Sequence, residues 1–400
     1  MEASSHGLSQ NRLDGLSFTT GIFTNLSQDH MDYHSNIKDY LKAKLYLFEK
    51  LIKKNGNIIT DEKISEYNQI KKIASKKNLN LFSLLDEKNN FKFLSHQFEG
   101  ESQLLRIKYN NSTYKIKLNL IGKVQLKNIL MATIAAIKSN ISIKDILKVI
   151  PRIKSVNGRF EKIGKIKNNS KVILDYAHTP DALKTCLKNL KEQFPDHKVS
   201  LVFGCGGNRD QNKRAKMGKI ADLYSDKIYL ADDNPRSEQP SKIRKDIKKG
   251  IKKQKVFEFT SRARAISKAI DNLNIGEILL VAGKGHETVQ EIGEKKIFFS
   301  DKKIILNAIK IKNITLSNNL KANIINELSG EKKISPAVSL KHARINSKEI
   351  KKNDIFFAIK GKKNNGNKFV SEAFNKKASV AIVNTINKNN SRKNQVRVND

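Results

Sequence analysis

The 400-residue chain lacks several features that mark whole classes of protein. It has no tryptophan and only two cysteines, Cys186 and Cys205, which excludes a disulfide framework or a cysteine-rich metal site and favours a reducing cytoplasm. No apolar run approaches the roughly 20 residues of a membrane span. The polar start carries no basic segment typical of a signal peptide. These absences indicate a cytoplasmic protein. The length of 400 residues leaves room for two or three domains.

Acidic residues are also few relative to basic ones. The chain has 77 Lys and Arg but 39 Asp and Glu, which gives a formal net charge of +38. Such an excess is typical of nucleic-acid-binding proteins. The lysines are nevertheless spread along the whole chain among Asn and Ile, and neither zinc-finger spacing nor an RNA-binding aromatic signature occurs. We therefore expect no specific nucleic-acid partner, although polyanions should adhere at low salt.

The first part of the chain mixes helical and strand patterns. Residues 39–54 carry a broad apolar helical face, and short strand-like runs alternate with polar turns from about 55 to 120. Residues 123–139 are predicted to form a buried helix, and residues 141–154 a short one.

From residue 157 onward, strands and helices alternate with short connections. The predicted strands are 171–175, 199–203, 227–231, 255–259 and 277–282, and the predicted helices are 180–194, 213–224, 241–253 and 261–273. This alternation predicts a doubly wound, largely parallel α/β sheet. Ligands bind such sheets beyond the carboxyl ends of the strands.

Polar turns follow four of these strands. One of them, Asp232-Asp233-Asn234-Pro235-Arg236, places a guanidinium beside a rigid proline and suits recognition of a carboxylate. The others are residues 175–180, 204–210 and 283–287, which contribute glycines, three carboxylates, two imidazoles and Arg209. Each turn alone could be a surface loop or a helix cap, but turns at the same edge of one sheet are expected to meet in one pocket.

Near the start, acids and imidazoles cluster before the helix that carries Lys44. The cluster comprises Glu2, Asp29, His30, Asp32 and His34. Carboxylate oxygens with an imidazole could hold Mg²⁺ beside phosphates, and a polar loop with helix-capping acids is the alternative. No Gly-x-x-x-x-Gly-Lys-Ser/Thr phosphate loop occurs in the 400 residues, and Gly283-Lys284-Gly285 does not replace it.

Residues 1 to about 310 resemble the MurE-type members of the Mur ligase family. The matching strings are residues 2–8, 23–34, 43–44, 158–161, 175–180, 203–210, 233–236 and 283–287. The resemblance implies an α/β protein with a remnant of the Mur ligase central ATPase domain in residues 1–155. It also implies a Rossmann-like C-terminal ligase domain that binds the amino acid in residues 156–311. A linker of residues 312–334 and a small α/β domain of residues 335–400 would follow.

The resemblance implies roles for individual residues. Glu2, His30 and a carbamylated Lys44 would be catalytic and hold Mg²⁺, while Ser5, Gln10 and Arg12 would contact the UDP-muramoyl substrate. ATP would meet Asn128, Arg159, Asp175 and His178, although Gln125 stands where the family has Asn. The pocket for diaminopimelate would consist of Arg209, Asp233, Asn234, Arg236, Gly283 and Glu287.

The implied reaction is the ATP-dependent addition of meso-diaminopimelate to UDP-MurNAc-L-Ala-D-Glu in peptidoglycan precursor synthesis. ATP would phosphorylate the D-glutamate side chain, and the amine would attack the acyl phosphate. Lysine-adding relatives lack the arginine at position 236, and an unpaired buried guanidinium should reject lysine. A lysine-adding ligase and a non-catalytic scaffold remain the alternatives.

Residues 335–400 resemble the N-terminal substrate domain of a MurF-type ligase, on the strings 345–348, 353–361 and 366–370. Lys348 and Asn367 depart from the family's Arg and His. We therefore expect a piece of a MurE–MurF fusion, cut at both ends and unable to complete the ligation by itself. Other enzymes of the Mur pathway are possible partners.

Overall fold

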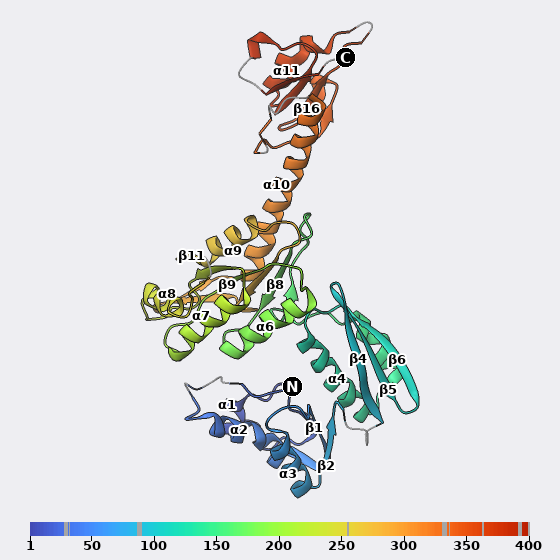
Figure 1. The fold of residues 1–400 in the computed structure, drawn as a ribbon, viewed down its shortest axis with the longest axis vertical. Coiled ribbons are helices and arrows are strands. Elements are labelled where there is room, and N and C mark those ends of the chain that lie inside the picture. The colour runs from blue at the N-terminus through green and yellow to red at the C-terminus, as the bar shows by residue number, and fades with distance from the viewer. Residues whose placement is uncertain are drawn as a thin grey trace. The chain divides into compact units, whose positions relative to one another are not determined.

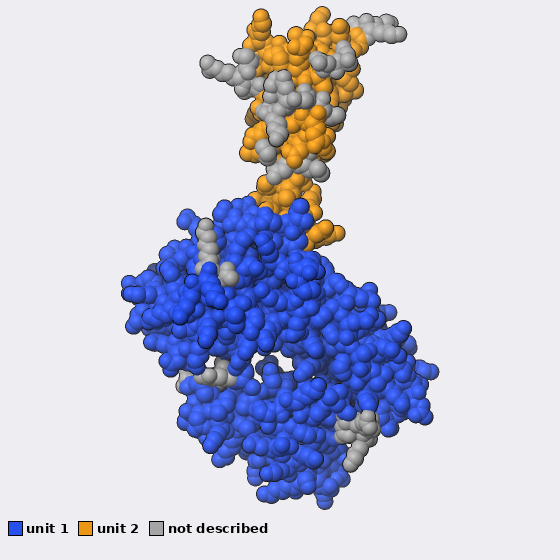
Figure 2. All heavy atoms as spheres, viewed as in Figure 1, with its two compact units in different colours: residues 1–164, 170–306 blue, residues 165–169, 307–400 orange. Residues whose placement is uncertain are grey.

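The computed structural model describes residues 1–27, 31, 33–85, 90–253, 256–329, 334–335, 337–361, 364–390 and 394–398. Contacts divide the chain into two compact units (Figure 2). Unit 1 comprises residues 1–164 and 170–306, and unit 2 comprises residues 165–169 and 307–400. Among the described helices, none is long and apolar enough to cross a membrane.

Unit 1 begins with a small parallel sheet in the order β1-β2-β3. Its elements are α1 (Ser5–Ser9), β1 (Phe18–Ile22), α2 (Ile37–Tyr46), the π-helical turn η1 (Leu47–Leu51), β2 (Ile52–Thr60), α3 (Tyr67–Lys77) and β3 (Asn80–Ser83). The helix predicted over residues 39–54 is wrong at its end. Residues 52–54 belong to β2, because pairing with β1 already begins at Ile52, opposite Phe18.

An antiparallel sheet and two helices follow. They are β4 (Phe91–Glu99), β5 (Ser102–Tyr109), β6 (Ser112–Leu118), α4 (Lys123–Lys138), α5 (Ile143–Val149) and the 3₁₀ turn η2 (Ile150–Arg152). Strands β4, β5 and β6 confirm the strand runs predicted between 55 and 120, but the helix α3 in the same range was not predicted. The α5 helix is shorter than the predicted 141–154. Ser142 caps its start by accepting a hydrogen bond from Asp145 N, and Pro151 lies in the 3₁₀ turn that ends it.

The predicted doubly wound sheet is confirmed. Its six strands have the order β11-β10-β9-β12-β8-β7, and all pairs are parallel except β7 with β8. The strands are β7 (Glu161–Lys162), β8 (Lys171–Asp175), β9 (Val199–Phe203), β10 (Lys227–Ala231), β11 (Val256–Phe259) and β12 (Ile278–Ala282). The helices are α6 (Pro180–Gln193), α7 (Asn212–Tyr224), α8 (Pro240–Lys248) and α9 (Arg262–Asp271).

Helices cover both faces of this sheet, with α6 and α7 on one side and α9 on the other (Figure 1). Strands β9 and β12 are buried along their whole length, which explains why they appear as continuous apolar runs in the sequence. The carboxyl ends of β8, β9, β10 and β12 therefore lie at one edge, where the predicted polar turns begin.

A hairpin and a long helix follow the main sheet in the chain. The hairpin consists of β13 (Val289–Ile292) and β14 (Lys295–Phe298), and the helix α10 runs over Asp301–Ser329. Most of the segment predicted as a linker, residues 312–334, is thus helical as far as Ser329. It is helical because Ala322 and Ile325 pack into the core of unit 2 beside Leu340.

Unit 2 contains a parallel sheet in the order β15-β16-β17-β18. Its elements are β15 (Ala343–Arg344), η3 (Ser347–Glu349), β16 (Ile355–Ala358), η4 (Gly366–Phe369), α11 (Val370–Asn375), β17 (Val380–Val383), η5 (Lys388–Asn390) and β18 (Gln395–Arg397). Helix α11 packs Val370 and Phe374 against the sheet residues Phe356 and Ala381. These strands and helices agree with the small α/β domain expected for residues 335–400.

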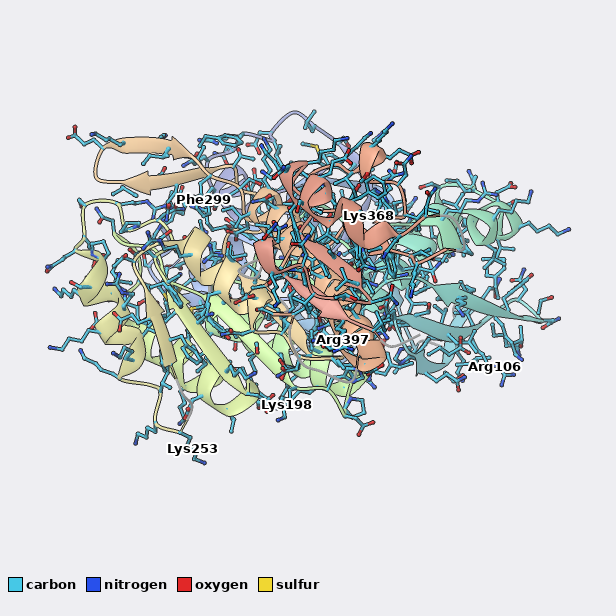
Figure 3. The ribbon with its side chains drawn as sticks, turned by 90° about the horizontal axis from the view of Figure 1, so that it is seen from above. Arg106, Lys198, Lys253, Phe299, Lys368 and Arg397 are labelled. Carbon is cyan, nitrogen blue, oxygen red and sulfur yellow. The ribbon has the colours of Figure 1, made fainter. Side chains whose placement is uncertain are left out.

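Basic side chains are exposed on elements far apart in the sequence. Arg106 on β5, Lys198 before β9 and Lys253 after α8 are examples (Figure 3). This spread agrees with the even distribution of lysine in the sequence.

Candidate functional site

A cavity of about 300 Å³ lies at the carboxyl edge of the main sheet. The turns that follow β8, β9, β10 and β12 all contribute to its lining. All six residues predicted to bind the amino acid line this one cavity, namely Arg209, Asp233, Asn234, Arg236, Gly283 and Glu287. His178, predicted to contact ATP, lines it as well. The structure therefore brings together residues that lie up to 109 positions apart in the sequence.

The turns can approach so closely because of glycine. A Cβ atom at Gly207 would lie 1.9 Å from the carbonyl oxygen of Pro235, so the turn after β9 tolerates no side chain there. Gly283 has φ +116°, and a Cβ atom there would lie 2.7 Å from Asp233 Oδ2. Glycine at these two positions thus lets three strand ends share one cavity.

Arg236 is the half-buried arginine of the 233–236 turn. Its Nε donates to Glu291 Oε2 at 2.7 Å, and its Nη1 donates to the carbonyl of Gly207 at 2.8 Å. The prediction of an unpaired guanidinium is therefore wrong, because Glu291 lies 55 positions away and the sequence gives no sign of its pairing with Arg236. Within the described part of the chain, no hydrogen bond from Nη2 is found, so Nη2 can still donate to a ligand carboxylate.

Asn234 is held in one orientation by a buried lysine. Lys284, fully buried, donates from Nζ to Asn234 Oδ1 and to Glu287 Oε2, both at 2.8 Å. The backbone N–H of Glu291 also donates to Asn234 Oδ1, at 3.1 Å. Because an ammonium and an amide N–H can only donate, Oδ1 must face them, and Nδ2 donates to Glu287 Oε2 at 3.1 Å.

Asp233 lies beside a buried ion pair. Arg262 and Asp301 are fully buried and joined by two hydrogen bonds of 2.9 and 2.7 Å. Burial opposes the charge of Arg262, but the carboxylate of Asp301 outweighs it and raises the pKa of the guanidinium. Arg262 Nη1 lies 3.9 Å from Asp233 Oδ2. Arg262 thus lies behind the cavity residue Asp233. The sequence does not predict this cation, because helix α9 carries no recognisable motif.

The cavity lining combines charges of both signs. Arg209 and Arg236 supply guanidinium groups, and Asp233 and Glu287 supply carboxylates. Such a lining suits a ligand that carries both ammonium and carboxylate groups, since each charge finds an opposite partner.

Three of the residues predicted to contact the nucleotide lie on separate segments. Asn128 is on α4, Arg159 precedes β7, and His178 follows β8. Arg159 is exposed and stacks over the ring of Tyr176 at 4.7 Å, and His178 Nδ1 lies 3.0 Å from the carbonyl of Tyr176. Asn128 is exposed on α4. The neighbouring Gln125 donates to the carbonyl of Arg159 at 3.1 Å, which links α4 to this segment.

Asp175 is turned inward. Its Oδ2 accepts from Phe160 N at 2.7 Å, and its Oδ1 accepts from Ala177 N at 2.8 Å and from Cys186 Sγ at 3.3 Å. Burial raises the pKa of this carboxyl, against the lowering effect of those hydrogen bonds. Asp175 thus fastens residue 160 to the end of β8, and a nucleotide would have to share its oxygens.

The predicted muramoyl contacts lie at the start of the chain. Ser5 is buried, and its hydroxyl lies 3.0 Å from His34 Nε2. Gln10 donates to the hydroxyl of Tyr33 at 3.1 Å, and Arg12 is exposed. The structure does not bring these three residues into the cavity described above.

The predicted magnesium ligands are only partly covered by the structure. Glu2 is exposed, and Lys44 places Nζ 5.0 Å from the centre of the Tyr40 ring. His30, with Asp29 and Asp32, lies outside the described residues. Among the residues that are described, no group of three or more His, Cys, Asp or Glu could hold a metal ion.

Cys205 lines the cavity, although its side chain is almost fully buried. Burial raises the pKa of its thiol to about 12, and burial also raises the pKa of Cys186. We predict that neither thiol of the folded protein reacts within minutes with a chromogenic disulfide reagent in mildly alkaline buffer. Both should react at once in guanidinium chloride. Rapid labelling of the folded protein would contradict the burial of these side chains.

Comparison with known proteins agrees with the fold. The model of the Mur ligase middle domain matches residues 1–136, and that of the Mur ligase glutamate ligase domain matches residues 158–285. The UDP-N-acetylmuramoyl-L-alanyl-D-glutamate–2,6-diaminopimelate ligase of Rickettsia montanensis is 39% identical over 311 residues. That match covers 78% of this chain and 64% of the relative, so the chain spans less than two thirds of the relative's length.

Solved structures show the same fold. A structure of a UDP-N-acetylmuramoyl-L-alanyl-D-glutamate–2,6-diaminopimelate ligase matches with a TM-score of 0.53 and 30% identity, over 78% of this chain and 64% of that one. The MurF ligase of Thermotoga maritima in complex with ADP matches with a TM-score of 0.56 over 78% of this chain and 65% of that one. At 14% identity this second likeness concerns the fold alone. With two domain models that together match more than half of its residues, the chain belongs to the Mur ligase family.

Proposed function

We propose that the cavity binds meso-diaminopimelate, and that the chain is part of a ligase that uses ATP to add this amino acid to UDP-MurNAc-L-Ala-D-Glu. The name of the Rickettsia relative supports the substrates. The observation that carries the proposal is that the six predicted amino-acid-binding residues line one cavity. Diaminopimelate carries two ammonium and two carboxylate groups, which matches the mixed charges of that lining.

Arg236 would bind the carboxylate that diaminopimelate has and lysine lacks. Its Nη2 would donate to that carboxylate, while Glu291 and Gly207 hold the other nitrogens. Because Glu291 already balances the charge, rejection of lysine would rest on a lost charge-assisted hydrogen bond. Such a bond contributes about 1.5–3 kcal/mol, or roughly 10- to 150-fold in affinity.

Glu287 and Asp233 would bind an ammonium group of the ligand. Glu287 uses Oε2 for Lys284 and Asn234, which leaves Oε1 for the ligand within the described part of the chain. The two ends of the amino acid would thereby be fixed. The amine that attacks the activated D-glutamate carboxylate would thereby be held in one orientation.

The nucleotide would be bound through the side chains of Arg159, His178 and Asn128. A MurF ligase of the same fold has been solved in complex with ADP. Mg²⁺, held by Glu2, His30 and carbamylated Lys44, would neutralise phosphate charge when bound. Ser5, Gln10 and Arg12 would contact the UDP-muramoyl substrate.

We also propose that residues 335–400 are the start of a MurF-type substrate domain. The four-stranded parallel sheet of unit 2 and the motif residues support this. Asp354, within one of those motifs, accepts hydrogen bonds from the backbone N–H groups of Lys351 and His342. The two family matches end at residue 285, so this part stays a prediction.

The two buried free cysteines favour a cytoplasmic location.

Calorimetric titration of the chain with meso-diaminopimelate and with L-lysine tests the proposed function. We expect saturable binding of diaminopimelate and at least tenfold weaker binding of lysine, from the loss of one charge-assisted hydrogen bond. Equal binding of both would favour a lysine-adding ligase. Binding of neither would contradict the proposal.

A further inference from the structure

The β13–β14 hairpin is attached to the turn that carries Arg236. Gln290, which is buried, donates from Nε2 to the carbonyl of Asp233 at 2.6 Å. The backbone of Arg236 donates to the carbonyl of Glu291 at 3.1 Å and accepts from Gly293 N at 2.7 Å. With the contact of Glu291 N to Asn234, the hairpin thus contacts three of the four residues of the turn.

The hairpin also fixes an unusual backbone conformation. Arg236 has φ +49°, in the left-handed region that residues other than glycine rarely adopt. The two backbone hydrogen bonds to the hairpin hold it there. Without them, the turn could relax and move the side chain away from the cavity.

Glu291 helps to fix the orientation of the Arg236 guanidinium. It accepts from Nε, and Gly207 O accepts from Nη1 on the far side of the fork. A Cβ atom at Gly206 would lie 3.0 Å from Nη1, so the second turn also confines the group. Since a guanidinium is planar, fixing two of its nitrogens fixes the direction of Nη2.

We propose that Glu291 is a positioning residue which sets the preference of the cavity for a ligand with a second carboxylate. This rests on the proposed function and extends it from the motif 233–236 to a hairpin more than 50 residues further along. Glu291 touches no ligand in this scheme. It holds Arg236 so that a distal carboxylate meets Nη2 without first having to order the side chain.

The matched pair Glu291→Ala and Glu291→Gln separates this role from a mere ion pair. Gln keeps an oxygen that accepts from Nε, whereas Ala removes the acceptor. We expect Glu291→Ala to weaken binding of meso-diaminopimelate about tenfold, with little change for L-lysine. Glu291→Gln should retain the selectivity of the unmodified chain. Glu294→Ala, on the exposed turn of the same hairpin, should change neither.

The readout is the dissociation constant for L-lysine divided by that for meso-diaminopimelate. A general loss of stability would not lower this ratio. In an Arg236→Ala background, Glu291→Ala should have no further effect on that ratio. A ratio unchanged by Glu291→Ala, or lowered as much by Glu291→Gln, would overturn the inference. Absence of diaminopimelate binding by the unmodified chain would instead overturn the proposed function, so the two failures are distinct.

Discussion

Replacing Arg236 with Ala is expected to weaken binding of meso-diaminopimelate by about 30- to 100-fold. The side chain would offer a charge-assisted hydrogen bond to the ligand, and its loss costs about 2–3 kcal/mol. Titration calorimetry of the variant measures the change directly.

Two controls accompany this prediction. Arg264→Ala removes an exposed arginine from helix α9 and should leave the affinity unchanged. Affinity for L-lysine should also stay within about threefold in Arg236→Ala, because lysine lacks the second carboxylate. Full diaminopimelate affinity in Arg236→Ala would show that another residue selects the ligand.

Replacing Asp301 with Ala is expected to produce the largest loss of stability. The change leaves the Arg262 guanidinium fully buried without its carboxylate partner, which typically costs about 3–5 kcal/mol. This is a large share of the roughly 5–15 kcal/mol that stabilise a folded domain. Urea unfolding followed by circular dichroism measures the change in the free energy of unfolding.

Asp271→Ala provides the matched control, since the Asp271 side chain is 61% exposed and pairs with Lys268 on the surface of α9. It should cost less than about 1 kcal/mol. The buried pair also bears on the cavity, because Arg262 Nη1 lies 3.9 Å from Asp233 Oδ2. Diaminopimelate affinity should therefore fall with stability in Asp301→Ala. A loss no greater than that of Asp271→Ala would contradict the role of the pair.

The sequence alone is sufficient to predict the main sheet and the cavity residues. Strands such as Val199–Phe203 and Ile278–Ala282 are buried on both faces, so they appear as short apolar runs, each followed by glycine. The polar turns follow directly from the strand ends, and parallel strands bring those ends to one edge. For this reason the order of residues along the chain already assigns Arg209, Arg236 and Glu287 to one pocket.

The features that the sequence does not show depend on contacts between distant residues. The β13–β14 hairpin has no apolar alternation, since all four residues of β14 are exposed, and its role follows only from its contacts with residues 233–236. The pairing of Glu291 with Arg236 and of Arg262 with Asp301 spans 55 and 39 positions. The Asn- and Lys-rich composition of helix α10 predicts a linker, but packing of Ala322 and Ile325 outweighs that composition.

The most direct test of the account is a crystal structure of the chain with meso-diaminopimelate. We predict that one ligand carboxylate lies within about 3 Å of Arg236 Nη2, with an ammonium group beside Glu287. Glu291 should still accept from Arg236 Nε in that complex. A ligand bound with both carboxylates away from Arg236 would contradict the account.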